Sequence, residues 1–363
     1  MANKINHLLT AYQQLRQQND DWVLATIIET LGSTYQKPGA RMLINQQGEL
    51  NGLLGGGCFE RDLVEQAQSV FASGECKTVF YDMRAPEDIV WGLGLGCNGA
   101  VRVLLQRLSA ADGFSPLNIL AETAEQQLSG MLVTIYASTH ADFPVGHSVF
   151  LPNPAAHPHL AASAEPLATA TYSHQSRLET LTISGLTVKA FYDSLQPPWQ
   201  LLIVGAGADS LPLLASAKAL GWRVTVIDYR PAHIRPERFP NADQLCLLRP
   251  EELADNFSLN HYQAAVIMTH NVDNDARYLK ALATTRIPFM GLLGPSHRKE
   301  RLLHSLGDDA ERLAGRVFGP VGLDIGAETP EEIALSIMAG IHAQLNGRSG
   351  RQLGHKTAGV GEV

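Results

Sequence analysis

The sequence predicts an α/β protein in which an N-terminal α+β domain is followed by a domain built on a parallel sheet. The chain has 363 residues, which is more than one hydrophobic core usually serves. Before residue 196, strands at hairpin spacing are mixed with helical patterns. Residues 201–340 instead alternate buried strands with helices, and this order places parallel strands side by side.

The boundary between the two domains is predicted at residues 196–199, where two prolines interrupt both helix and strand. We therefore expect an N-terminal domain over 1–196, in which 109–196 is a weakly patterned extension. A Rossmann-like domain should follow over 197–345. The last segment, 346–363, is rich in Gly and Arg and is expected to be a mobile tail.

The composition excludes several classes of protein. The net charge is -8 and no long basic cluster occurs, which argues against nucleic acid or an anionic membrane as a partner. The four cysteines form no Cys-x-x-Cys pair, so neither a structural zinc site nor a disulfide framework is indicated. The N-terminus lacks the apolar core of a signal peptide, and no apolar run approaches the roughly 18 residues of a membrane span. We expect a cytoplasmic protein.

The N-terminal domain is predicted from simple periodicities. Apolar residues at helical spacing predict helices at 5–18 and 59–71. Runs rich in Val, Ile and Thr predict strands at 22–30, 77–83 and 100–105, and a hairpin over 42–54. Further strands are predicted at 131–138, 147–151, 178–183 and 186–191, the last two joined by the turn Ser184-Gly185.

Three consecutive glycines, Gly55, Gly56 and Gly57, followed by Cys58, mark the first candidate site. Glycine is costly to order, so such a run suits a sharp turn or the close approach of a ligand. The following helix would direct free N–H groups at the loop, where they favour an anion and a partly ionised thiol. Acidic residues in its first turn oppose a thiolate, so any fall in the pKa of Cys58 should be modest. The alternative is a tight turn with a buried cysteine.

A second glycine-rich stretch ends in Cys97. Glycines at 92, 94 and 96 alternate with leucines, which would leave one face of an extended chain bare for a flat ligand or for another backbone. The alternative is close sheet packing or a bulge. The polar loop 32–41 should lie near Gly55, so its Ser33 and Arg41 are candidates for binding phosphate or carbonyl oxygens, unless the loop is merely solvated.

The C-terminal domain carries an incomplete dinucleotide fingerprint. A buried strand runs into Gly205 and Gly207, but Ser210 replaces the third glycine, and Pro212 predicts that the helix begins near 210 or 211. Asp228 ends the next strand, where a ribose-binding carboxylate belongs, and Arg230 leaves the choice between NAD and NADP open.

Three further segments of this domain carry polar signals. His270 follows a parallel strand, where Asp273 could orient it for acid–base work, while Asn274 could simply cap the next helix. A basic loop at 294–299 is plausible for phosphate. Thr329 with Glu332 predicts a strong helix start.

The ordered set of these motifs resembles the xanthine dehydrogenase accessory proteins, the XdhC–CoxI family. The N-terminal motifs are Gly32-Ser33-Thr34, Pro38-Gly39-Ala40-Arg41-Met42, Gly56-Gly57-Cys58-Phe59-Glu60 and Gly94-Leu95-Gly96-Cys97-Asn98-Gly99. The C-terminal motifs are Gly205-Ala206-Gly207, Val226-Ile227-Asp228-Tyr229-Arg230, Met268-Thr269-His270-Asn271, Gly291-Leu292-Leu293-Gly294-Pro295 and Gly319-Pro320-Val321-Gly322-Leu323-Asp324-Ile325-Gly326. Gly55 and Asn98 are mild departures from the family pattern.

The resemblance implies a chaperone for the molybdenum cofactor (molybdopterin), a non-enzymatic accessory factor and a homodimer. Such a protein would protect the cofactor while a cysteine desulfurase supplies sulfur, and would then pass it to an apo-molybdenum hydroxylase of the xanthine dehydrogenase type. Cys58 and Cys97 would contact molybdenum or its sulfur, because thiolates are soft ligands. The expected cofactor-binding residues are Ser33, Arg41, Gly55, Gly56, Gly57, Cys58, Gly96, Cys97, Gly205, Gly207, Asp228 and His270.

Two other functions fit parts of the sequence. One is an NAD(P)-dependent oxidoreductase that uses the second domain, with His270 as its acid–base residue. The other is a nucleotide-sensing or scaffold protein without chemistry. The second domain could thus hold NAD(P), another nucleotide or no nucleotide.

Overall fold

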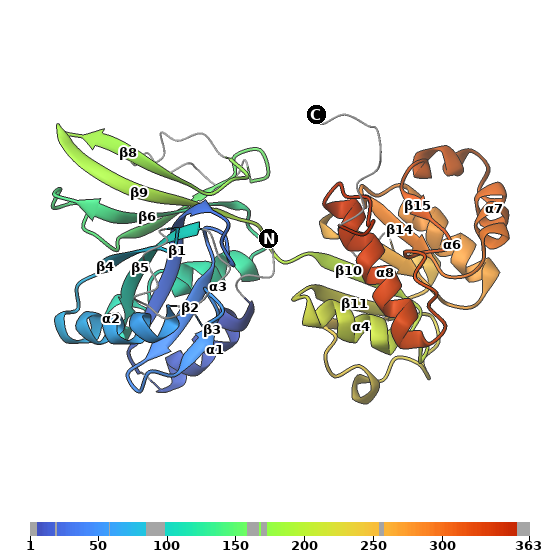
Figure 1. The fold of residues 1–363 in the computed structure, drawn as a ribbon. Helices are drawn as coiled ribbons and strands as arrows, with labels where there is room; N and C mark the ends of the chain where they lie inside the picture. Colours follow the sequence, from blue (N-terminus) through green and yellow to red (C-terminus); the bar gives the residue numbers. More distant parts are fainter. Residues whose placement is uncertain are drawn as a thin grey trace. The chain divides into compact units, whose positions relative to one another are not determined.

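The computed structural model of the chain describes residues 6–18, 20–57, 59–84, 99–157, 167, 173–253 and 258–353. The chain divides into two compact units, Met1–Pro197 and Pro198–Val363, which are described separately below (Figure 1). The mixed α/β class predicted from the sequence is confirmed, with antiparallel sheets in the first unit and a parallel sheet in the second.

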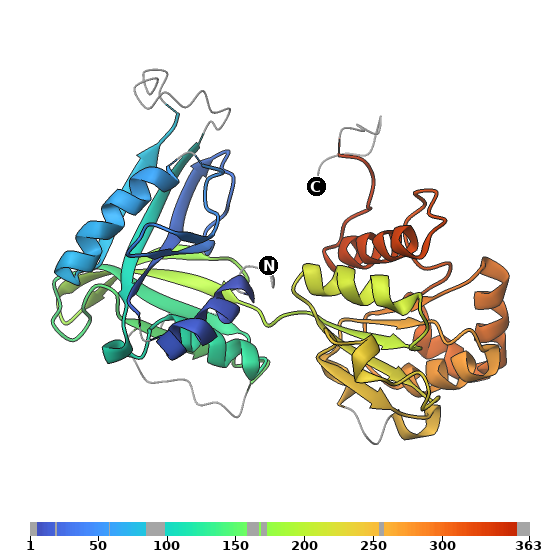
Figure 2. The same ribbon diagram turned by 90° about the horizontal axis from the view of Figure 1, so that it is seen from below.

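The first sheet of the N-terminal unit is antiparallel and has the order β3-β2-β1-β5-β4. Its strands are β1 (Trp22–Gly32), β2 (Arg41–Asn45), β3 (Leu50–Gly52), β4 (Lys77–Asp82) and β5 (Gly99–Leu108). Successive side chains of β1 alternate between faces, and Val23, Ala25 and Ile27 pack on the side of helix α2 (Glu60–Ser73). Figure 2 shows α2 lying along this sheet.

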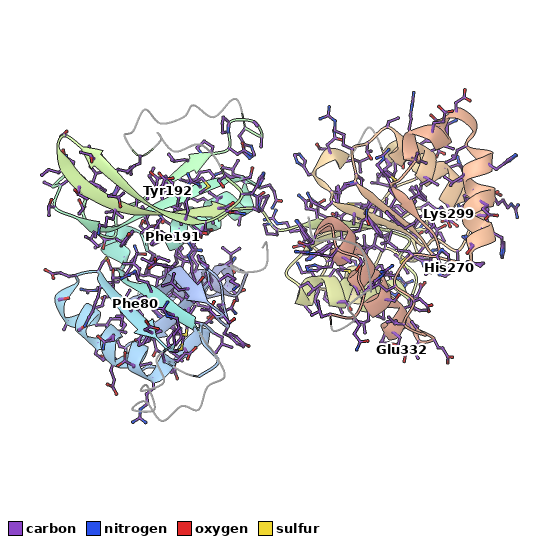
Figure 3. All side chains as sticks on the ribbon, turned by 45° about the horizontal axis from the view of Figure 1, so that its top comes forward. Phe80, Phe191, Tyr192, His270, Lys299 and Glu332 are labelled. Atoms are coloured by element: carbon purple, nitrogen blue, oxygen red, sulfur yellow. The ribbon has the colours of Figure 1, made fainter. Side chains whose placement is uncertain are left out.

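A second antiparallel sheet, of order β7-β6-β9-β8, completes the N-terminal unit. Its strands are β6 (Gly130–Ser138), β7 (Ser148–Pro152), β8 (Arg177–Ile183) and β9 (Leu186–Leu195). Phe191 of β9 packs on Ile28 and Leu104 of the first sheet, whereas the neighbouring Tyr192 belongs to the cluster on the opposite face (Figure 3). Helices α1 (Asn6–Gln18) and α3 (Leu117–Glu125) share a core cluster with both sheets.

The C-terminal unit is a parallel six-stranded sheet of order β12-β11-β10-β13-β14-β15 with helices on both faces. Its strands are β10 (Gln200–Val204), β11 (Arg223–Asp228), β12 (Gln244–Leu247), β13 (Ala264–Ile267), β14 (Phe289–Leu292) and β15 (Val317–Phe318). One core cluster joins the sheet to α4 (Ser210–Ala219) and α8 (Pro330–Leu345). The other joins it to α6 (Val272–Ala283) and α7 (Ser296–Ser305), as Figure 1 shows. Short 3-10 helices lie at Ala110–Asp112, Pro236–Arg238, Pro250–Glu252, Leu259–His261 and Gly307–Leu313.

The helix starts test the predicted caps. Thr329 and Glu332 form the expected capping box at the start of α8, and α4 begins at Ser210 as predicted. The prediction that Asn274 caps the helix after β13 is wrong. Asn271 is the N-cap, and its side chain accepts a hydrogen bond from the N–H of Asn274 at 3.0 Å. Both residues are asparagines, so composition alone could not separate them.

Candidate functional site

The N-terminal glycine loop is closed by a carboxylate from its own chain. Glu60, the first residue of α2, is 4% exposed and turns its side chain back over the loop. Its Oε1 accepts hydrogen bonds from the N–H groups of Leu54 (3.3 Å) and Gly55 (2.5 Å). Its Oε2 accepts them from Gly57 (3.0 Å) and Phe59 (3.3 Å). These four N–H groups of the loop are therefore already bonded to a carboxylate of the protein.

The three glycines of this loop are required for different reasons. A Cβ built on Gly55 would lie 2.4 Å from the Phe59 ring, so no side chain fits there. Gly56 and Gly57 have φ values of 68° and 97°, which side chains rarely adopt. Apart from Gly57 and its neighbours in the chain, no heavy atom of the described residues lies within 4 Å of a Cβ built on Gly57. Among these residues, none covers the backbone of Gly57 on that side.

Three of the predicted motifs converge at one end of the first sheet. Gly32 pairs with Gly99 across β1 and β5, and a Cβ on Gly99 would lie 2.3 Å from the carbonyl oxygen of Ser33. A Cβ on Gly56 would lie 3.8 Å from the ring of Tyr35, in the same loop as Ser33. The loop that holds Ser33 therefore reaches the start of β5 through Ser33 and the glycine loop through Tyr35.

Cys58, Gly96 and Cys97 lie outside the described residues, so their predicted contacts with the cofactor stay predictions. Their places along the chain are nevertheless bounded by described neighbours. Cys58 is flanked by Gly57 and Phe59, and Cys97 precedes Gly99 by two residues. Both flanking segments belong to the converging end of the sheet.

Arg41 is held in a buried ion pair. Its Nη2 lies 2.7 Å from Oδ2 of Asp193 on β9, and the two side chains are 3% and 5% exposed. Its Nη1 also donates to the carbonyl of Gly39 at 3.0 Å. A buried pair of this kind fixes β2 against the second sheet, and breaking it costs far more than losing an exposed pair. The contacts favour a structural role for Arg41 over the predicted contact with the cofactor.

Tyr81 supports the glycine loop from β4. Its ring stacks on Phe59 at a centroid distance of 4.8 Å, and its hydroxyl donates to Oδ2 of Asp62 at 2.5 Å. Burial raises the pKa of Tyr81 strongly, and the hydrogen bond to Asp62 and the charges of Asp62 and Glu60 raise it further. The phenol therefore remains a protonated donor, and it holds the first turn of α2 in place.

The C-terminal glycine loop follows β10 and packs against β13. A Cβ on Gly205, whose φ is 120°, would lie 2.5 Å from the backbone oxygen of Met268. Ser210, which replaces the third glycine of the fingerprint, is fully buried, and its hydroxyl donates to the carbonyl of Gly207 at 2.7 Å. The serine is tolerated because its hydroxyl is satisfied within the loop.

Asp228, the predicted ribose ligand, is fully buried and has both carboxylate oxygens engaged. Its Oδ2 accepts from the N–H of Ala206 at 2.7 Å and from Nη2 of Arg230 at 2.7 Å, while its Oδ1 accepts from Nε of Arg230 at 2.9 Å. Burial alone would raise the pKa of Asp228, but the hydrogen bonds from Arg230 and Ala206 outweigh it and hold the pKa below its usual value. Asp228 ties the glycine loop to β11.

His270 pairs with a residue that the sequence analysis did not single out. Its Nε2 lies 2.7 Å from Oδ2 of Asp209, in the glycine loop, so the predicted orientation by Asp273 is wrong. The side chains of His270 and Asp209 are 58% and 25% exposed. His270 has a φ of 60°, which is uncommon for a residue other than glycine and marks a local constraint. Asp209 could have been found from its place inside the glycine fingerprint.

Next to His270, a buried carboxylate organises the same edge of the sheet. Asp275 is 1% exposed, accepts from the Thr269 hydroxyl at 2.5 Å and binds Nη2 of Arg298 at 2.5 Å. Arg298 belongs to the basic segment 294–299 that was predicted to bind phosphate, and it lies in the first turn of α7. Its guanidinium binds Asp275. Figure 3 shows His270 and Lys299 on the same side of this unit.

Among the described side chains, no group of three or more His, Cys, Asp and Glu residues could hold a metal ion. Within the same part of the chain, no helix has both the length and the apolar character needed to cross a membrane.

Comparison with known proteins identifies the family. Residues 15–82 match the XdhC and CoxI family, and residues 201–341 match the XdhC Rossmann domain. A probable xanthine dehydrogenase subunit of Bacillus subtilis strain 168 is 33% identical over 337 residues, which cover 92% of this chain and 96% of that protein. The chain belongs to the XdhC and CoxI family. The resemblance predicted from the sequence motifs is thereby confirmed.

Two other members and neighbours extend the comparison of this XdhC and CoxI protein. The molybdenum cofactor insertion chaperone PaoD of Escherichia coli K12 is 23% identical over 326 residues, covering 87% of this chain and 81% of PaoD. The crystal structure of a xanthine dehydrogenase from Bacillus halodurans matches with a TM-score of 0.73 and 28% identity. The match covers 94% of this chain and 96% of the Bacillus halodurans chain, so both units share the fold of that protein.

Proposed function

We propose that this protein binds the molybdenum cofactor as cargo and supports its insertion into a molybdoenzyme. The observation that carries the proposal is the convergence of three family motifs at one end of the first sheet, where Ser33 meets Gly99 and Tyr35 meets Gly56. Membership of the XdhC and CoxI family supports the same function, since one relative is named a molybdenum cofactor insertion chaperone. The protein acts as an accessory factor and needs no catalytic residue for this role.

Glu60 decides which part of the cargo the N-terminal loop accepts. Because its carboxylate already accepts from four backbone N–H groups of the loop, a phosphate would meet an anion there. The loop instead offers the bare backbone at Gly57, against which a flat pterin can lie. Cys58 and Cys97 then supply thiol groups for molybdenum or its sulfur.

The acidic surroundings suit a reversible thiol ligand. Glu60 accepts hydrogen bonds from the residues on both sides of Cys58, and Asp62 follows within the same helical turn. Negative charge near a thiol disfavours its ionised form. Cys58 should therefore hold the metal end of the cofactor transiently and release it, which a carrier requires.

The finer parts of the proposal concern partners and place. The client is an apo-enzyme of the xanthine dehydrogenase type, a cysteine desulfurase supplies the terminal sulfur while the cofactor is bound, and the carrier acts as a homodimer in the cytoplasm. The name of the Bacillus subtilis relative supports the class of client. Pull-down with the apo-enzyme and with the desulfurase would test the two contacts separately.

The decisive test is retention of the cofactor by purified variants. Wild-type protein, Cys58→Ala and Cys97→Ala would be loaded with the cofactor, and the pterin retained would be measured by the fluorescence of its oxidised form. Cys246→Ala is the matched control, because Cys246 lies on β12 in the other unit, where burial raises the pKa of its thiol. We expect the first two variants to lose most of the pterin and the control to retain it. Wild-type retention by both would remove the thiols from the proposal.

A further inference from the structure

The strand order of the C-terminal unit defines where a ligand would enter. In the order β12-β11-β10-β13-β14-β15, the connections run in opposite directions from the pair β10 and β13. In open α/β sheets, ligands bind at the carboxyl ends of the strands at this switch point. Two loops border the crevice here: 205–209 after β10, and 268–271 after β13.

A contact between two side chains of the protein bridges this crevice. Asp209 comes from the first loop and His270 from the second, and their Oδ2 and Nε2 atoms lie 2.7 Å apart. Asp209 immediately precedes α4, a helix of 10 residues, so its carboxylate lies at the helix end that attracts anions. In a dinucleotide-binding domain, the pyrophosphate takes that place.

The space over the second glycine is also filled. In the dinucleotide fingerprint, the second glycine lets the pyrophosphate approach the backbone. Here a Cβ built on Gly207 would lie 2.4 Å from Oδ1 of Asp209, so the Asp209 carboxylate occupies that approach. The glycine makes room for a side chain of the protein rather than for a ligand.

The carboxylate that would bind the ribose is also occupied by partners within the protein. Asp228, at the end of β11, is fully buried. Its oxygens accept hydrogen bonds from the N–H of Ala206 and from the guanidinium of Arg230. A ribose hydroxyl would have to displace one of these partners. Both features that recognise a dinucleotide are thus satisfied within the chain.

We propose that Asp209 determines the ligand specificity of the C-terminal unit. Its carboxylate contacts His270 at the place where the phosphate of a ligand would otherwise lie, and it therefore excludes nucleotides that carry a pyrophosphate. The inference concerns the second unit and does not depend on cofactor binding by the first. It follows that neutralising Asp209 opens the crevice, with His270 as the group that then contacts the pyrophosphate.

The test is the binding of ADP, measured by isothermal titration calorimetry on the full-length protein. We expect Asp209→Asn and Asp209→Ala to bind ADP about tenfold more tightly than the wild type, because a carboxylate within a few ångströms of a phosphate costs on the order of 1 kcal/mol or more at a partly exposed site. Adding His270→Ala to Asp209→Asn should abolish the gain. Circular dichroism melting would establish that each variant is folded.

Asp273→Asn is the matched control, since Asp273 is an exposed carboxylate in the first turn of α6. It should leave ADP affinity unchanged, because Asp273 takes no part in the bridge between Asp209 and His270. An equal gain from Asp273→Asn would reduce the effect to net charge and overturn the proposal. Folded Asp209 variants that bind ADP no more tightly than the wild type would also overturn the proposal.

Discussion

Glu60 and Asp209 are both acidic residues that turn back over a glycine-rich loop at the start of a helix, but their surroundings differ. Glu60 is 4% exposed and accepts hydrogen bonds from four backbone N–H groups. The Asp209 side chain is 25% exposed and binds one side chain, His270, which is itself 58% exposed. The buried carboxylate is part of the fold, because removing it would take an acceptor away from four N–H groups at once. The partly exposed one contributes little to the stability of the fold, so it can be replaced by mutation at small cost.

One glycine from each of these two loops, Gly57 and Gly205, should show the largest difference in tolerance to a side chain. Gly205→Ala forces a side chain into a φ of 120° and against the backbone oxygen of Met268 at 2.5 Å. Strain and overpacking together should lower the free energy of unfolding by about 4 kcal/mol. Gly57→Ala has the strain without the clash and should cost about 1 kcal/mol. Urea denaturation followed by tryptophan fluorescence measures both, and equal losses would contradict the packing at Gly205.

Removing Glu60 should be the next largest effect. Glu60→Ala leaves buried N–H groups of the loop without their acceptor, so we expect the free energy of unfolding to fall by about 3 kcal/mol. Glu65→Ala, an exposed residue of the same helix, is the control and should stay within about 0.5 kcal/mol of the wild type. Chemical denaturation of the two variants side by side provides the measurement. Comparable stability of both would show that Glu60 is as dispensable as a surface residue.

The contribution of Asp228 to the free energy of unfolding should depend on pH. Because the hydrogen bonds from Arg230 and Ala206 hold its pKa below the usual value, the ionised form stabilises the fold above pH of about 4. This contribution is lost as pH falls through the lowered pKa of the folded state. Asp228→Asn should therefore cost about 2 kcal/mol at pH 7, and the difference from wild type should shrink in acid. Unfolding curves at pH 7, 5 and 3 would measure it, and a difference that grows in acid would be the wrong sign.

Asp209→Asn should have the smallest effect on stability. The contact between Asp209 and His270 lies at a solvent-accessible site and is worth less than about 1 kcal/mol, so the midpoint of thermal unfolding should barely move. A cost as large as that of Glu60→Ala would make the bridge to His270 a structural element. The distinction between a carboxylate that the fold requires and one that it does not require would then fail.

Much of the fold was predictable because its signals are local. The strand pattern of 22–30, the cap at Thr329 and the turn at Ser184-Gly185 all depend on neighbours in the chain, and each is found where predicted. Helix α3 was missed although Leu117, Leu120 and Ala124 recur at helical spacing, since nine residues give a weak signal. Strand β15 has two residues, too few to show any period.

For the candidate site, the sequence could single out residues, but it could not predict which residues they contact. The glycine loops, Asp228 and His270 stand out by residue type and by position after a strand, and the loop 32–41 contacts the glycine loop through Tyr35 and Gly56. Arg41 was expected to bind an oxygen of the cofactor, and its partner among the described residues is Asp193, 152 positions further along the chain. A pairing over that distance has no local pattern, so it could not be inferred from composition or spacing.

By itself, the sequence determined the family, the two kinds of sheet and the residues that can carry chemistry, because periodicity and motif order are properties of the chain. Only the tertiary structure decided which groups the glycine loops hold. The acidic first turn of α2 was expected to oppose a thiolate, and the structure shows that its Glu60 also binds the backbone of the loop before it. Asp209 faces His270 because β10 and β13 are neighbours in the sheet although far apart in sequence. Such partners are set by the packing of strands, which brings distant side chains together.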